Sequence, residues 1–247
     1  MTFQDHFSAV AARYAEFRPT YPAELFAWLA YLCKEHEAAW DCATGSGQAA
    51  IGLAPHFTQV VATDASAEQI AHADGPGNVI FRVAPAEASG LQDRSVDLVT
   101  VAQAAHWFDL PKFFDEARRV LKPGGVLALW GYGRLDLPGE MDAIFQHFYS
   151  ATIGPWWPPE RQWIDDGYRS LAFPFEAIPA PAFRIEVQWD LPRLLDYLST
   201  WSAVKRYRAA KNDDPLPALR AELQPLWGDA ATPLKLMWPL FLRVGRR

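Results

Sequence analysis

The sequence predicts an α/β fold built on a doubly wound, mostly parallel sheet. Short apolar segments alternate with amphipathic ones between residues 38 and 130, which is typical of repeated βαβ units. The apolar segments show no polar alternation, as expected for strands that are buried on both faces. A glycine turn, Gly45-Ser46-Gly47, joins the first apolar segment to a helix. These observations favour a sheet with helices on both sides.

Strands and helices are expected to alternate from the N-terminus onward. Helices are expected over residues 7–17, 22–35, 47–57, 67–74 and 110–121. Strands are expected over residues 38–42, 59–63, 79–83, 96–101 and 126–130. Ser66 and Gln69 have the spacing of a capping box at the start of one helix, and Pro123-Gly124-Gly125 is expected to stop another.

The alternation ends after Trp130. Eight of the 11 tryptophans lie from this residue onward, and residues 134–181 are rich in proline and aromatic residues, with a helix near 140–151. Further on, the pattern predicts a strand over 183–189, helices over 191–208 and 217–227, and a strand over 234–244. The predicted units are an N-terminal helical cap (1–37), a ligand-binding core (38–133), an inserted aromatic-rich lid (134–181) and C-terminal strands and helices that complete the core (182–247), with a lid helix near 191–211.

Composition and charge exclude several classes of protein. The formal net charge of −6 disfavours binding to a nucleic-acid backbone. No apolar run reaches the ~20 residues of a membrane helix, and the first ten residues do not resemble a signal peptide. Cys33 and Cys42 are too few for a disulfide scaffold or a zinc cluster, and the six histidines lack the close spacing of a metal motif. We therefore expect a cytoplasmic protein with no metal, membrane or nucleic-acid partner.

The turn after the first strand is the strongest candidate site. Glycine lets the chain turn tightly and lets a ligand approach the main chain at the start of a helix. Asp64 follows nineteen residues after Gly45, at the end of the second strand. In doubly wound sheets, a carboxylate at this place accepts hydrogen bonds from ribose hydroxyls. The sequence therefore predicts a site for an adenosine cofactor.

Further acidic positions favour a positively charged cofactor. Asp41 stands four residues ahead of Gly45, and Glu87 follows the third strand. A carboxylate beside the turn suits a cofactor with a sulfonium and an amino group, and it suits a pyrophosphate poorly because like charges repel. The run Gly45-x-Gly47-x-x-Ala50 also matches a dinucleotide fingerprint, so a nicotinamide-dependent oxidoreductase is the alternative.

Several motifs together resemble one family. They are Tyr14-x-x-x-Arg18-Pro19-x-Tyr21-Pro22, the run from Asp41 to Gly47, Asp64-Ala65-Ser66, Gln103-Ala104-Ala105-His106-Trp107-Phe108 and Arg118-Arg119-Val120-Leu121-Lys122-Pro123-Gly124-Gly125. With these motifs the chain resembles the class I S-adenosylmethionine-dependent methyltransferases, in particular the type 11 branch that includes trans-aconitate-methyltransferase-like proteins. The resemblance covers roughly residues 3–133. It implies a Rossmann-like sheet of seven strands, and S-adenosyl-L-methionine as the cofactor with S-adenosyl-L-homocysteine as its product.

The resemblance also implies roles for individual residues. The cofactor-binding residues that it implies are Tyr14, Arg18, Asp41, Ala43, Thr44, Gly45, Gly47, Asp64, Ala65, Ser66, Ala86, Glu87 and Gln103. Tyr14 and Arg18 would close over the cofactor, Asp41 to Gly47 would hold its methionine part, and Asp64 its ribose. Family members often have Gly-Cys-Gly where this chain has Ala43-Thr44-Gly45. We expect this departure to be tolerated because we expect the backbone at Ala43 to need no positive φ.

His106 is the candidate catalytic residue. Its ordinary pKa lies near working pH, so it can serve as a general base for a hydroxyl or amine, or it can only shape the pocket. A carboxylate acceptor would need no base. The aromatic insertion can cover an apolar or aromatic acceptor or simply pack, and a substrate carboxylate has three candidate partners, Arg134, Arg161 and Arg169.

The acceptor is expected to be a small molecule. No Asn/Asp-Pro-Pro-aromatic sequence follows the fourth strand and no Pro-Cys pair exists, which argues against methylation of DNA. A catalytically silent protein that only binds the cofactor is the third hypothesis. For the assembly, both a monomer and a homodimer are compatible with the sequence.

Overall fold

The computed structural model describes residues 19–247. The helix predicted over residues 7–17, together with Tyr14 and Arg18, lies outside the described residues. Within 19–247, no helix is both long and apolar enough to span a bilayer.

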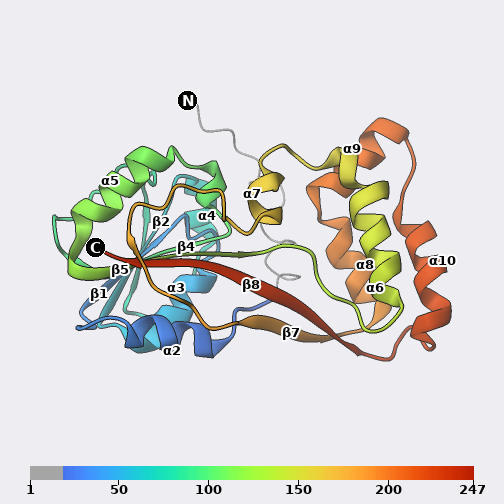
Figure 1. Cartoon of the computed structure of the whole chain (residues 1–247), viewed down its shortest axis with the longest axis horizontal. Helices are drawn as coiled ribbons and strands as arrows, with labels where there is room; N and C mark the ends of the chain where they lie inside the picture. Colours follow the sequence, from blue (N-terminus) through green and yellow to red (C-terminus); the bar gives the residue numbers. More distant parts are fainter. Residues whose placement is uncertain (1–18) are drawn as a thin grey trace.

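A single large sheet forms the centre of the molecule (Figure 1). Within residues 19–247 it has eight strands in the order β3-β2-β1-β4-β5-β8-β6, with β7 paired to β8 alone. Strands β1 to β5 run parallel to one another, and β8 is antiparallel to β5, β6 and β7. The predicted doubly wound, mostly parallel sheet is confirmed. The strands are β1 (Ala38–Cys42), β2 (Gln59–Asp64), β3 (Val79–Val83), β4 (Val96–Ala102), β5 (Leu121–Tyr132), β6 (Glu176–Ala177), β7 (Arg184–Trp189) and β8 (Leu234–Arg246).

Helices cover both faces of the sheet. Figure 1 shows α2 (Ala23–Tyr31) and α3 (Gln48–Leu53) on one side and α5 (Leu110–Val120) on the other. Alternate residues of β5 belong to two separate cores: Val126, Ala128 and Trp130 pack with α2 and α3, whereas Leu127 and Leu129 pack with α5. This division follows from the two-residue period of a strand, and it explains why β5 is apolar at every position from 126 to 130.

The first half of the predicted capping box is confirmed, whereas the N–H of Ser66 donates to the carboxylate of Asp64 rather than to the side chain of Gln69. Ser66 precedes α4 (Ala67–His72), and its side-chain oxygen accepts a hydrogen bond from the backbone N–H of Gln69.

Other predicted boundaries were wrong. The second helix ends at Tyr31 rather than near residue 35. Helix α5 ends at Val120, and β5 begins at the next residue, so Pro123-Gly124-Gly125 lies inside the strand rather than stopping the helix. By contrast, helix α6 (Met141–His147) continues as a π-helix through Thr152, which agrees with the helix predicted near residues 140–151.

The helix predicted over residues 191–208 is two helices. Helix α8 (Leu191–Ser199) and α9 (Ser202–Lys211) are separated at Thr200 and Trp201. Trp201 is extended, with φ −65° and ψ 137°, and it is buried against Phe145 and Tyr149. Burial of this indole outweighs the local preference for a continuous helix.

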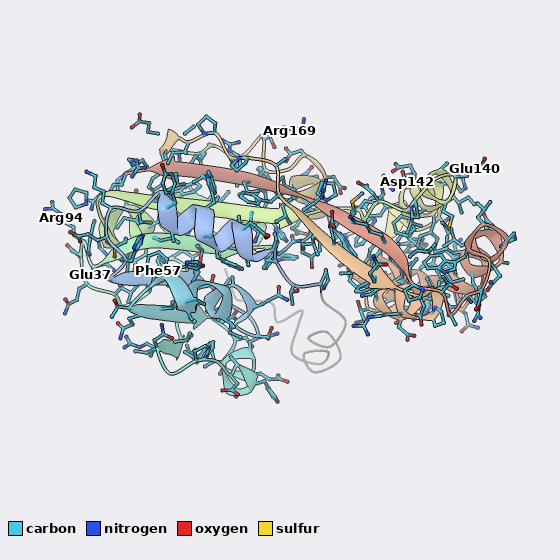
Figure 2. All side chains as sticks on the ribbon, turned by 90° about the horizontal axis from the view of Figure 1, so that it is seen from below. Glu37, Phe57, Arg94, Glu140, Asp142 and Arg169 are labelled. Atoms are coloured by element: carbon cyan, nitrogen blue, oxygen red, sulfur yellow. The ribbon has the colours of Figure 1, made fainter. Side chains whose placement is uncertain are left out.

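Four helices, α6, α8, α9 and α10 (Leu216–Trp227), form a second lobe to which β7 and β8 extend (Figure 1). In Figure 2, Glu140 and Asp142 lie in this lobe, whereas Glu37 and Arg94, which precede β1 and β4, lie at the far end of the molecule. The helical lobe therefore lies beyond the carboxyl ends of the parallel strands. The predicted insertion is divided: residues 141–157 join the lobe, while α7 (Arg161–Asp165) and the chain after it return to the core.

Close packing between α2 and α3 generates the first prediction. A Cβ on Gly52 would lie 2.2 Å from the ring of Phe26, which is buried against Tyr21 and Trp130. Alanine usually stabilises a helix relative to glycine by about 1 kcal/mol, but this clash should dominate. We expect Gly52→Ala to lower the free energy of unfolding by about 1–3 kcal/mol in urea titrations.

Gly77→Ala is the matched control, because no atom of the described residues lies within 4 Å of a Cβ at Gly77. It should change stability by less than about 0.5 kcal/mol. Equal effects of the two substitutions would contradict the packing argument.

Candidate active site

The turn between β1 and α3 is held in a left-handed backbone conformation. Ala43, Gly45 and Gly47 have φ values of 55°, 56° and 87°. The expectation that Ala43 needs no positive φ was therefore wrong. The N–H of Thr44 donates to the carbonyl of Thr63 at 2.9 Å, and this bond to β2 fixes the turn despite the cost of an alanine in this region.

Asp41 stabilises the turn through hydrogen bonds to its buried carboxylate. Its carboxylate is 1% exposed and accepts hydrogen bonds from the hydroxyls of Thr44 (2.5 Å) and Thr100 (2.8 Å). Burial raises the pKa of Asp41 to about 6, the two hydroxyls oppose that rise, and the nearby Asp64 adds to it. Both carboxylate oxygens therefore bind groups of the protein itself, and the direct effect of Asp41 is to hold the shape of the turn.

Asp64, at the end of β2, joins the turn to the next helix. One carboxylate oxygen accepts from the N–H of Gly45, and the other accepts from the N–H of Ser66, each at 2.9 Å. The nineteen-residue spacing seen in the sequence therefore corresponds to a direct contact. Ala65 is exposed between these anchors, and Ser66 is buried.

Three carboxylates converge at the carboxyl edge of the sheet. The pKa of the buried Cys42 thiol is raised by burial first, and then by Asp41, Asp64 and Glu87. Glu87, beside the buried Ala86, accepts a hydrogen bond from the N–H of Asp109. This negative edge favours a cation and disfavours a pyrophosphate. Among residues 19–247, a Cβ built on Gly45 would meet no atom within 4 Å, so these residues leave room beside the turn.

Gln103 follows β4 and is strained. It is a non-glycine residue with φ 58°, and its side-chain amide donates to the carbonyl of Tyr132, at the end of β5, at 2.8 Å. Strain of this kind costs about 1–3 kcal/mol and is typical of functional sites. The structure thus brings Gln103 to the same edge as the glycine turn.

His106 contacts Tyr168, and no motif in the sequence predicts this pair. Its Nδ1 lies 2.9 Å from the hydroxyl of Tyr168, which is fully buried and has φ 58° after Gly167 at φ 63°. Burial lowers the pKa of His106 to about 4, and the charge of Arg161 adds to this effect. Tyr168 was expected only among the aromatic residues of the insertion, and no sequence signal links two residues 62 positions apart.

The three candidate arginines have different surroundings. Arg134 forms ion pairs with Asp142 and Asp136, so its charge is already compensated within the protein. Arg169 donates to the carbonyl of Asp166. Arg161 lies over the ring of Trp157 at 4.4 Å. Among the three, the charge of Arg161 is the one that acts on His106.

Aromatic residues connect the sheet edge to the helical lobe. Tyr132 contacts Trp238, Trp238 contacts Tyr197, Tyr197 contacts Trp201 and Trp201 contacts Trp157, with centroids 5.3–6.3 Å apart. We call these five residues the aromatic bridge. Trp238 is fully buried and Trp201 nearly so, which makes them packing residues, whereas Trp157 is half-buried. Beside His106, Phe108 packs on Phe113 and Trp107 remains 40% exposed.

Taken together, the edge presents acidic groups near the turn and a neutral histidine beside a cation further along. Among the described residues, no cluster of histidine, cysteine or acidic side chains has the arrangement of a metal site. The carboxylates at the turn suit a positively charged ligand, and Gln103 and His106 follow the neighbouring strand β4 at the same edge.

Comparisons with known proteins agree with this arrangement. The model of a family described as a methyltransferase domain matches residues 40–129. A protein of Dictyostelium discoideum, provisionally named a methyltransferase, is 37% identical over 225 residues, which cover 90% of this chain and 86% of the relative. A methyltransferase of Mycobacterium tuberculosis with no assigned substrate is 37% identical over 125 residues, half of each chain.

Solved structures show the same similarity. A protein of Anaeromyxobacter dehalogenans, provisionally named a type II methyltransferase, superposes with a TM-score of 0.90 at 43% identity, covering 93% of this chain and 98% of that one. The cyclase SpnF has a TM-score of 0.55 at 17% identity, covering 98% of this chain and 94% of that one. The second likeness shows the fold alone.

The left-handed turn predicts opposite effects for two neighbouring substitutions. Gly45→Ala places a Cβ at φ 56° and should lower the free energy of unfolding by about 1–2 kcal/mol. Ala43→Gly removes such a Cβ at φ 55°, so it should be neutral or stabilising despite the greater freedom of the unfolded chain. Urea unfolding of both variants without ligand checks this, and a clear loss in Ala43→Gly would contradict it.

The raised pKa of Asp41 predicts that the stability of the folded protein depends on pH. Its pKa is about 6 in the folded protein against an ordinary value of 3.8, so the folded state takes up the proton first. Its contribution to stability therefore grows as the pH falls through 6. When the pH is lowered from 7 to 5, the free energy of unfolding of the wild type should rise by about 1 kcal/mol relative to that of Asp41→Asn, which cannot titrate at this position. Urea unfolding of both proteins at the two pH values measures these free energies. An unchanged difference between wild type and variant would show that the pKa of Asp41 is ordinary.

Proposed function

Because the chain belongs to the class I S-adenosylmethionine-dependent methyltransferases, we propose that it methylates a small molecule held at the carboxyl edge of its sheet. The observation that carries the proposal is the convergence of Asp41, Asp64 and Glu87 around a left-handed glycine turn. This edge is built for a positively charged nucleoside. A nicotinamide dinucleotide would bring its pyrophosphate against the same carboxylates, which argues against the oxidoreductase alternative.

Each residue at the edge has a proposed part in binding the cofactor. Ala43 to Gly47 would hold the methionine part, Asp64 would accept from the ribose hydroxyls, and Ala86 and Glu87 would flank the adenine together with Ala65 and Ser66. Asp41 keeps the turn in shape by binding two threonine hydroxyls. When bound, S-adenosylmethionine supplies an electrophilic methyl group on a sulfonium. Tyr14 and Arg18, outside the described residues, keep their proposed role of closing over it.

The acceptor is proposed to bind next to Gln103 and His106, with residues of the insertion as its cover. The position of α7 supports this, because Tyr168 and Arg161 from this part of the chain act on His106. An acceptor covered in this way by the insertion would be a small molecule rather than a folded macromolecule. Alignment of the two reactants can supply much of the rate in such a site.

The experiment that tests the cofactor site is Asp64→Ala. Loss of charged hydrogen bonds to the ribose should weaken binding of S-adenosylhomocysteine about 10- to 100-fold in calorimetry. Asp93→Ala is the control, because Asp93 pairs with Arg119 on the surface and should leave affinity unchanged. Unchanged affinity in Asp64→Ala, with the fold intact by circular dichroism, would remove Asp64 from the site.

A second measurement separates the transferase from a silent binder. Wild-type protein incubated with methyl-labelled S-adenosylmethionine and a mixture of small acids, alcohols and amines should transfer label. Binding without any transfer would support the silent alternative.

A further inference from the structure

One face of β8 is covered by the part of the insertion that follows α7. We call residues 167–176 the return segment, and Figure 1 shows the chain after α7 returning toward the C-terminal end of β8. Phe241, Arg243 and Gly245 lie two residues apart on β8, so they share a face of the sheet. Each of the three contacts a part of the return segment. The last strand therefore serves as the support on which this segment lies.

The ring of Phe241 is seated between two glycines. In the register of the sheet it lies opposite Gly131 of β5, where a Cβ would be 2.5 Å from the ring. On the side of the return segment, a Cβ on Gly167 would lie 3.3 Å from the Cβ of Phe241. The ring meets that of Tyr168 edge-on, with centroids 5.0 Å apart. Because Phe241 is closely packed on both sides, its position determines that of the Tyr168 ring.

Arg243 holds the backbone of the same turn. Its Nη1 donates to the carbonyl of Tyr168 at 2.8 Å and to the carbonyl of Arg169 at 3.1 Å. Its guanidinium also lies 5.3 Å from the ring centroid of Phe173. Tyr168 has a φ of 58°, a conformation that a non-glycine residue keeps only where the surrounding structure holds it. The bonds from Arg243 supply this restraint.

Tyr168 passes its position on to His106. Its ring is fully buried, and its hydroxyl lies 2.9 Å from Nδ1 of the imidazole. Burial first, and then the charge of Arg161, lowers the pKa of His106 to about 4. A shift of the Tyr168 ring would break a buried hydrogen bond and let water reach the imidazole.

We propose that Phe241 and Arg243 are positioning residues for methyl transfer, because they hold the turn at Tyr168 and Tyr168 holds the imidazole of His106. The inference rests on the proposed function, in which the acceptor binds beside His106. It extends the site to β8, a strand that none of the sequence motifs includes. The geometry at the acceptor side then depends on the last strand of the sheet as well as on the residues that follow β4.

The titration of His106 tests the inference without any acceptor. Its imidazole signal in nuclear magnetic resonance is assigned by its loss in His106→Gln. In Phe241→Leu, the smaller side chain should let Tyr168 move and water reach the imidazole, so the charged fraction of His106 at pH 5 should rise about fivefold. Phe183→Leu is the matched control, because Phe183 is also half-buried and contacts an aromatic ring, that of Trp28, at 5.7 Å. It should leave His106 unchanged.

A second pair of variants removes the bonds to the backbone instead of the ring. Arg243→Met keeps an apolar stem but cannot donate, so it should also raise the charged fraction of His106 several-fold. Arg118→Met is its control: Arg118 donates to the carbonyl of Pro174 at 2.7 Å and lies over the ring of Phe175, further along the chain. Equal effects of the two arginine variants would overturn the role of Arg243. An unchanged His106 in both Phe241→Leu and Arg243→Met, with the fold intact by circular dichroism, would overturn the whole inference.

Turnover separates this inference from the proposed function. With methyl-labelled S-adenosylmethionine and the mixture of small acids, alcohols and amines, Phe241→Leu and Arg243→Met should each lower label transfer about threefold to tenfold. Their affinity for S-adenosylhomocysteine in calorimetry should stay within about twofold of the wild type, because Asp64 holds the turn at Gly45. Equal losses of affinity and transfer would indicate general damage to the fold and would overturn the positioning role. Absence of transfer in the wild type would count against the proposed function alone, since the titration of His106 decides the inference independently.

Discussion

The carboxylate of Asp64 holds the site together. It accepts from the N–H of Gly45 and from the N–H of Ser66, and so joins the turn after β1 to the start of α4 through the end of β2. Hydrogen bonds to an ionised acceptor are stronger than neutral ones, which suits a contact that must hold left-handed residues in place. The shape of the turn and part of the negative charge of the edge depend on this arrangement.

Charge divides the candidate active site into two regions. Around the turn, acidic side chains face a buried thiol and create an environment for a cation. Near His106, the nearby charge is that of Arg161, which together with burial lowers the pKa of the imidazole.

The helical lobe is attached to the sheet by aromatic contacts. The aromatic bridge runs from Tyr132, at the end of β5, into the lobe, and most of its members are buried. Aromatic contacts of this kind add about 0.5–1.5 kcal/mol each beyond the area they bury, so the lobe is firmly attached. Helix α7 and the turn at Tyr168 pack on the core itself, where the hydroxyl of Tyr168 contacts His106.

The sequence alone determined the sheet, the glycine turn and the converging carboxylates. These features depend on local patterns, namely the two-residue period of strands, capping residues and the order of βαβ units, which bring the ends of successive parallel strands to one edge. Only the tertiary structure decided the left-handed state of Ala43, the break before Trp201 and the Tyr168–His106 contact. In each case a bond or a buried ring from a distant segment outweighs what the neighbouring residues prefer, and no local pattern carries that information.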